Sequence, residues 1–207
     1  MRSSSRSVQN LGRLAVSGQK AQLLQEGPDT GVKVLFQPVL DLDQGRVYGF
    51  EAQARIPGVT GIHGSTSLLE MITANHLQCR WLDDYYREAI CVASDQAQGK
   101  RLFLPVSYEL VHGHKKLVRQ LLEWCKFGGL AASQLVLQLR LPADDTLLPV
   151  FMESVALITS SPLSVSVMCH RQGFPMQATE ALLANVDFLG LDHTIVRDMD
   201  SDPLLQD

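Results

Sequence analysis

The sequence lacks several features that would assign a function at once. Its four cysteines, among 207 residues, are scattered and form no Cys-x-x-Cys pair, which argues against a zinc site or a disulfide framework. No apolar run is long enough to span a bilayer, and the start of the chain is too polar for a signal-peptide core. We therefore expect a cytoplasmic protein without membrane insertion.

The chain also lacks a strong excess of charge of either sign. Lys and Arg number 18 and Asp and Glu 22, which gives a formal net charge of −4 at pH 7. Without a long basic cluster, nothing would attract a nucleic-acid polymer or an anionic membrane. No Gly-rich phosphate loop follows the first apolar runs, so a nucleotide-binding Rossmann fold has no support.

The sequence has enough apolar residues to form the core of one domain. The hydrophobic content is 45%, and the length fits one domain, or one domain with a tail. Residues 1–30 are polar, and we expect a segment that is partly disordered or forms one short helix ending at Gly27-Pro28. Residues 31–207 form the domain proper.

Strand-like and helix-like patterns alternate along this domain. The expected strands are Val34–Leu40, Arg46–Phe50, Arg101–Ser107, Gln134–Leu141, Leu163–Met168 and Phe188–Leu191. The expected helices are Ser67–Asn75, Arg80–Gln98, Glu109–Lys126, Asp144–Ser160 and Met176–Asn185. This order predicts an α/β fold with a parallel sheet, either an open doubly wound sheet or a (β/α) barrel.

The first two expected strands carry the most informative residues. A polar turn, Asp41–Gly45, joins them, and Glu51 and Arg55 follow the second run. A carboxylate and a guanidinium at the end of a buried strand suit a metal and a phosphate. A surface salt bridge at a strand-to-loop junction is the other interpretation.

The wider segment resembles a known family. Phe36-Gln37-Pro38-Val39 and Gly49-Phe50-Glu51-Ala52-Gln53-Ala54-Arg55 are similar to the opening of the EAL family, the bacterial cyclic di-GMP phosphodiesterases, with Gln53 in place of the signature Leu. Near the other end, Val186–Asp192 resembles the family's strand that ends in Lys-Ile-Asp. The resemblance implies an α/β fold of the TIM-like (β/α) barrel type. With about six strands, we expect that barrel to be incomplete and C-terminally truncated.

The resemblance also implies that the catalytic pattern is lost. The family holds two divalent metals through carboxylates and an Asn at the carboxyl ends of its strands. Here Glu51 is the only matched metal ligand. The family's Asn, its second Glu, its Asp-Asp pair and its Lys fall on Pro105, Gln138, Met168-Cys169 and Gly190. We therefore expect no catalytic residues and no magnesium or manganese cofactor.

Four residues match the family's ligand site and are the candidate binding residues: Gln37, Glu51, Arg55 and Asp192. The hypothesis is a degenerate, inactive signalling module in a cyclic di-GMP-related pathway that acts through a protein partner or self-association. The alternative is a metal-independent cyclic di-GMP receptor, and an active phosphodiesterase is the least favoured interpretation. Because six strands would leave open edges, we expect either a fragment of a longer gene product or a partner or second copy that covers the gap.

Overall fold

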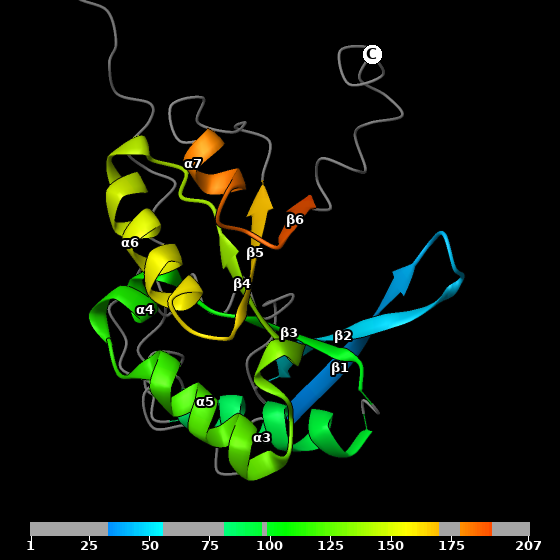
Figure 1. Cartoon of the computed structure of the whole chain (residues 1–207). Coiled ribbons are helices and arrows are strands. Elements are labelled where there is room, and N and C mark those ends of the chain that lie inside the picture. The colour runs from blue at the N-terminus through cyan, green and yellow to red at the C-terminus, as the bar shows by residue number, and fades with distance from the viewer. Residues whose placement is uncertain (1–32, 56–80, 97–98, 170–178, 192–207) are drawn as a thin grey trace, which may run out of the picture.

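The computed structural model of the chain describes residues 33–55, 81–96, 99–169 and 179–191 (Figure 1). The polar N-terminal segment, the expected helix Ser67–Asn75 and the candidate residue Asp192 lie outside the described residues. Within them, no helix is long and apolar enough to cross a membrane.

One six-stranded sheet, in the order β1-β2-β3-β4-β5-β6, organises the described residues. The strands are β1 (Lys33–Asp41), β2 (Arg46–Arg55), β3 (Arg101–Pro105), β4 (Leu135–Arg140), β5 (Ser164–Cys169) and β6 (Phe188–Leu191). From β2 to β6 all neighbours pair in parallel, as the alternating pattern predicted. The sheet is not wholly parallel, however, because β1 pairs antiparallel with β2 as a hairpin.

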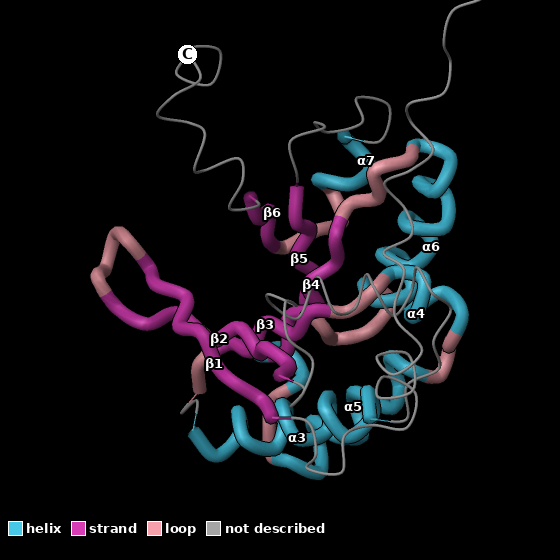
Figure 2. The backbone as a smooth tube through the Cα atoms, turned by 180° about the vertical axis from the view of Figure 1, so that it is seen from behind, coloured by secondary structure: helices cyan, strands magenta, loops and turns pink. Residues whose placement is uncertain are grey.

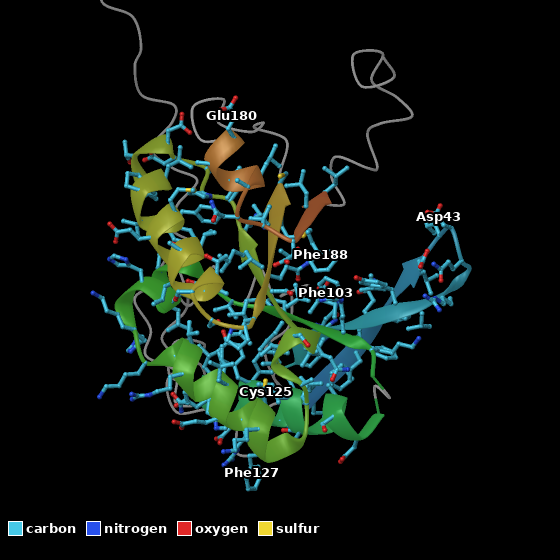
Figure 3. The ribbon with its side chains drawn as sticks, viewed as in Figure 1. Asp43, Phe103, Cys125, Phe127, Glu180 and Phe188 are labelled. Atoms are coloured by element: carbon cyan, nitrogen blue, oxygen red, sulfur yellow. The ribbon has the colours of Figure 1, made fainter. Side chains whose placement is uncertain are left out.

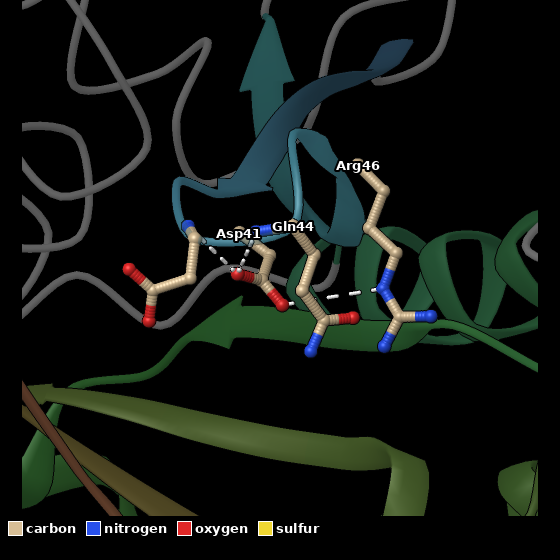
Figure 4. Close-up of polar contacts among 4 residues, drawn as sticks. Asp41, Gln44 and Arg46 are labelled. Carbon is tan, nitrogen blue, oxygen red and sulfur yellow. Dashed lines mark hydrogen bonds and ion pairs between the residues drawn. The ribbon is translucent and has the colours of Figure 1, made fainter.

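The hairpin turn is built by Asp41, in the expected turn Asp41–Gly45. Its Oδ1 accepts hydrogen bonds from the backbone N–H groups of Asp43 and Gln44, both at 3.1 Å (Figure 4). Its Oδ2 lies 4.0 Å from Nε of Arg46, and Gly45 takes the positive φ of 61° that the tight turn needs. The second strand does not stop at Phe50 as predicted, so Glu51 and Arg55 lie within β2 rather than beyond its end.

Helices cover one face of the sheet, and Figures 1 and 2 show them gathered on that side. They are α3 (Trp81–Gln96), α4 (Tyr108–Gly113), α5 (Leu117–Gly128), α6 (Leu148–Thr159) and the short α7 (Thr179–Leu183). Alternate strand residues face them and form the buried core; among these are Ala52, Leu102, Leu104, Leu137 and Val167. The helix-covered face is the convex face of the curled sheet, and its packing against helices is typical of α/β proteins.

The single helix expected over Glu109–Lys126 is wrong, because the segment forms two helices. Ser107 caps α4, since its Oγ accepts from the N–H of Leu110 at 3.2 Å, and the helix ends where His114 donates to the carbonyl of Leu110. The second helix, α5, ends at Gly128 and is capped by Gly129 with φ 81°, as the Gly-Gly pair predicted. The break lets α4 pack on α6 while α5 packs on α3.

The other, concave face of the sheet is strongly curled. The ring of Tyr48 on β2 lies 6.1 Å, centroid to centroid, from that of Phe188 on β6. In a flat sheet, four steps of about 4.8 Å would separate these strands by roughly 19 Å. The described strands therefore form part of a barrel wall, and the fold class predicted from the sequence, an incomplete barrel of six strands, is confirmed.

Candidate functional site

The candidate site lies on the concave face, at the carboxyl ends of the parallel strands. Side chains on this face alternate with the core residues of the convex face. Strand pairing sets Glu51 beside Phe103, and Pro105 beside Gln138. It also sets Met168 beside Gly190. Of the positions that fall on the family's catalytic groups, Glu51, Pro105, Gln138, Met168 and Gly190 thus share one face of the sheet. Cys169 alternates with Met168 along β5 and lies on the other face, paired with Leu191.

Three of the four candidate binding residues come together. Gln37 on β1 is the direct partner of Glu51 on β2, and Arg55 lies on the same face of β2, four residues on. Pairing in an antiparallel ladder brings opposite side chains within contact distance. Asp192 lies outside the described residues, so its relation to the other three is a prediction only.

Gln53 links these residues to one another. Its Nε2 donates to Oε1 of Gln37 at 2.6 Å, and its Oε1 accepts from Nη2 of Arg55 at 2.8 Å. The Arg55 guanidinium also donates through Nη1 to the carbonyl of Ala54 at 3.1 Å. The sequence shows that Gln53 stands where the family has a Leu, but its bond to Gln37 could not be predicted, because that contact crosses from one strand to the next.

Glu51 is a partly buried carboxylate in an amide-rich setting. Burial raises its pKa above the ordinary 4.5, while hydrogen bonds from the side chains of Gln53 and Gln138 partly offset the rise. The charged form of Glu51 is therefore held by two neutral amides, which stabilise it less than an ion pair or a metal would.

The donor set at the strand ends does not fit a divalent metal. Mg²⁺ and Mn²⁺ prefer several hard oxygen ligands. Beside Glu51, the structure offers Pro105, Gln138 and Met168, and the Gln138 amide donates to the Met168 sulfur at 3.1 Å. Among the described residues, no group of three or more His, Cys, Asp or Glu side chains could hold a metal ion.

Met168 also fills space that a longer residue at position 190 would need. A Cβ placed on Gly190 would overlap the Met168 sulfur and lie 3.1 Å from its terminal methyl carbon. The thioether thus occupies the place next to β6 where the resemblance puts a Lys. The methionine is held there by its contact with Gln138.

An aromatic cluster, formed by Tyr48, Phe103 and Phe188, lies next to the polar residues, since Phe103 is the pairing partner of Glu51. The ring centroids of Phe103 and Phe188 are 5.4 Å apart, with the two rings at 71° to each other (Figure 3). The guanidinium carbon of Arg101 lies 5.8 Å from the centroid of Tyr48 and 5.2 Å from that of Phe188. This cluster ties β2 and β3 to β6 and fixes the curl that brings the strand ends together.

The sequence could not place Tyr48 in this cluster. By simple alternation from Glu51, its side chain would point to the convex face. The pairing of β1 and β2 shifts between Val39 and Leu40, which leaves Tyr48 as an extra residue in a bulge. The next residue is Gly49, and a side chain there would clash with β3, because an added Cβ would lie 2.6 Å from the carbonyl oxygen of Arg101.

Solved structures with a similar fold include EAL-domain proteins. No family model and no curated protein matches the chain. Among solved structures, the PaMucR phosphodiesterase in complex with cyclic di-GMP is 16% identical, with a TM-score of 0.70 over 91% of this chain and 76% of its own. An EAL domain protein from Listeria monocytogenes EGD-e is 15% identical, with a TM-score of 0.64 over 93% of this chain and 75% of its own.

The EAL enzyme Bd1971, in its form bound to cAMP and cyclic di-GMP, is 17% identical with a TM-score of 0.65. The match covers 86% of this chain but 50% of that one, so the chain spans about half the length of this solved relative. At sequence identities this low, the similarity shows a shared fold and no more. The fold of this chain is that of the EAL domains, as the sequence resemblance predicted.

Proposed function

We propose that the chain is a catalytically inactive module of EAL type that works by binding rather than by hydrolysis, in a cyclic di-GMP-related pathway. The observation that carries the proposal is the donor set at the strand ends. Pro105 offers no side-chain ligand, and the Gln138 amide donates to the Met168 sulfur at 3.1 Å and to the Glu51 carboxylate. Calcium and manganese accompany cyclic di-GMP in two solved complexes of the similar Klebsiella pneumoniae BlrP1. This supports the proposal together with the lack, among the described residues, of any group of three or more His, Cys, Asp or Glu side chains that could hold a metal ion.

No metal cofactor and no catalytic residue are therefore part of the proposal. Hydrolysis of a phosphodiester at neutral pH needs a strong nucleophile and a way to stabilise charge on phosphorus. Glu51 is a carboxylate whose pKa is raised by burial, and its neighbours are neutral amides. Alone it could serve as a weak base, but among the described residues no group of three or more His, Cys, Asp or Glu side chains could hold a metal ion to generate a hydroxide.

A protein is the binding partner that the surface supports best. Exposed apolar side chains lie at the end of the hairpin, where Leu40 is 57% and Leu42 89% exposed, and on β6, where Leu189 and Leu191 are 49% and 50% exposed. Within the described residues, β1 and β6 are the two edges of the sheet. Exposed apolar groups on sheet edges are typical of association sites.

A metal-independent cyclic di-GMP receptor is the second candidate. One observation favours it: the structure gathers Gln37, Glu51 and Arg55 on one face of two neighbouring strands. An amide, a carboxylate and a guanidinium could recognise a guanine edge and a phosphate. Against it stands the mutual bonding of these groups through Gln53.

Calorimetric titration with cyclic di-GMP separates the candidates. We expect no heat of binding to the wild-type protein, with or without magnesium. Binding in the presence of a chelator would favour the receptor. Binding that requires magnesium would contradict the proposal, because it would reveal a metal site.

The protein-binding part has its own test in light scattering over a concentration series. If β6 is an association edge, apparent mass should rise with concentration, and Leu191→Asp should suppress that rise. Phe127→Asp is the control, since Phe127 is 85% exposed on α5, away from β6 (Figure 3). Equal effects of the two substitutions, or a concentration-independent monomer that also binds no protein partner, would contradict this part.

A further inference from the structure

Gln53 holds an unusual position among the polar side chains of the concave face. It lies on β2 between Glu51 and Arg55, and all three point to the same side because side chains alternate along a strand. On β1, the diagonal neighbour Gln37 reaches it across the ladder. One amide therefore touches three of the polar groups that an incoming ligand could use.

Both ends of the Gln53 amide are engaged. The Nε2 group donates to Gln37 at 2.6 Å and also hydrogen-bonds Glu51, while Oε1 accepts from the Arg55 guanidinium at 2.8 Å. Gln37 thus has its acceptor oxygen taken, and Arg55 has one donor arm turned along its own strand. The polar groups that would otherwise face a ligand are therefore hydrogen-bonded to one another.

This arrangement opposes ligand binding for an energetic reason. A ligand that took Arg55 or Gln37 would have to break these partly exposed hydrogen bonds, each of which is worth about 0.5–1.5 kcal/mol net. A ligand phosphate must therefore compete with the Gln53 oxygen, and a base edge must compete with its amide. Binding becomes favourable only when the competing amide is removed.

We propose that Gln53 is a specificity-determining residue that keeps the concave site closed to cyclic di-GMP. The inference rests on the proposed function, in which this site is a non-catalytic EAL-type site. Leu matches Gln in size and has no polar end, so Gln53→Leu releases Gln37 and Arg55 together without leaving a cavity. The released guanidinium can then face a phosphate, and the released amide a guanine edge.

The test is titration calorimetry with cyclic di-GMP in the presence of a chelator. Wild type should give no heat of binding, and Gln53→Leu should bind at least about tenfold more tightly than the weakest affinity the titration detects, a change of about 1.4 kcal/mol in binding free energy. Adding Arg55→Ala to Gln53→Leu should abolish the gain. Gln44→Leu, the same substitution in the exposed hairpin turn, should leave the affinity at the wild-type level.

Gln53→Ala serves as a second variant if Leu disturbs the sheet, and thermal melting reports on folding. Folded Gln53→Leu or Gln53→Ala with wild-type affinity would overturn the inference, as would a gain that persists without Arg55. Loss of folding in both would assign Gln53 to sheet stability and overturn it too. None of these results affects the proposed function, which fails instead if the wild-type protein hydrolyses the nucleotide.

Discussion

Phe188 offers the strongest test of the curled sheet, and Phe188→Ala is the perturbation. Its ring contacts those of Tyr48 and Phe103 at centroid distances of 6.1 and 5.4 Å, and the Arg101 guanidinium lies over it at 5.2 Å. Each aromatic pair is worth about 0.5–1.5 kcal/mol beyond buried area. The cation–π contact adds about 0.5–1 kcal/mol at a partly exposed site.

A full core truncation of Phe costs about 3–5 kcal/mol. Because Phe188 is only partly buried, on the edge strand β6, we expect a smaller loss, of about 2–3 kcal/mol in the free energy of unfolding. For a domain of this size, that corresponds to a fall in Tm of about 4–12 °C. Denaturant unfolding followed by circular dichroism would measure the free energy, and a thermal scan would measure Tm.

Phe127→Ala is the matched control, since Phe127 is 85% exposed on α5 and should change stability by less than about 0.5 kcal/mol. If Phe188→Ala cost no more than this control, the aromatic cluster would not hold β6 against β2 and β3. The curl of the sheet would then need another cause.

Two further predictions concern β2. Burial raises the pKa of Glu51, so the folded state favours its protonated form, and this residue's contribution to stability should fall as pH rises upward from about 4.5. At about pH 7, Glu51→Gln should therefore have a higher Tm than wild type, and at about pH 4 the two Tm values should be equal. A wild type that is more stable than Glu51→Gln at about pH 7 would contradict a raised pKa of Glu51. Gly49→Ala should cost more than about 2 kcal/mol, because the new Cβ would lie 2.6 Å from the Arg101 carbonyl oxygen. Gly113→Ala, with nothing within 4 Å of its added Cβ, is the control and should be close to neutral in the same denaturant assay.

Local patterns predicted most of the fold. The expected strands Leu163–Met168 and Phe188–Leu191 agree with β5 and β6 to within a residue, because buried parallel strands are short apolar runs with clear ends. The hairpin turn followed from Asp41 and Gly45. The expected helix over Glu109–Lys126 was wrong because its apolar spacing continues through Gly113–Lys116, while the two halves pack on different neighbours.

The candidate site was predictable only in part. Similar residues in a similar order indicated Gln37, Glu51 and Arg55, and strand pairing brings these three together. The bonds of Gln53 depend on the register of β1 against β2, and the direction of Tyr48 depends on a one-residue bulge. Composition and periodicity predict neither the bonds of Gln53 nor the direction of Tyr48, since both depend on the pairing between strands.

The most direct test of the central claim is a hydrolysis assay. Purified protein is incubated with cyclic di-GMP and either magnesium or manganese, and the products are separated by chromatography. The proposed function predicts no linear dinucleotide above a blank without protein, with either metal. Metal-dependent appearance of the linear product, abolished by Glu51→Ala, would contradict the claim that the module is catalytically inactive.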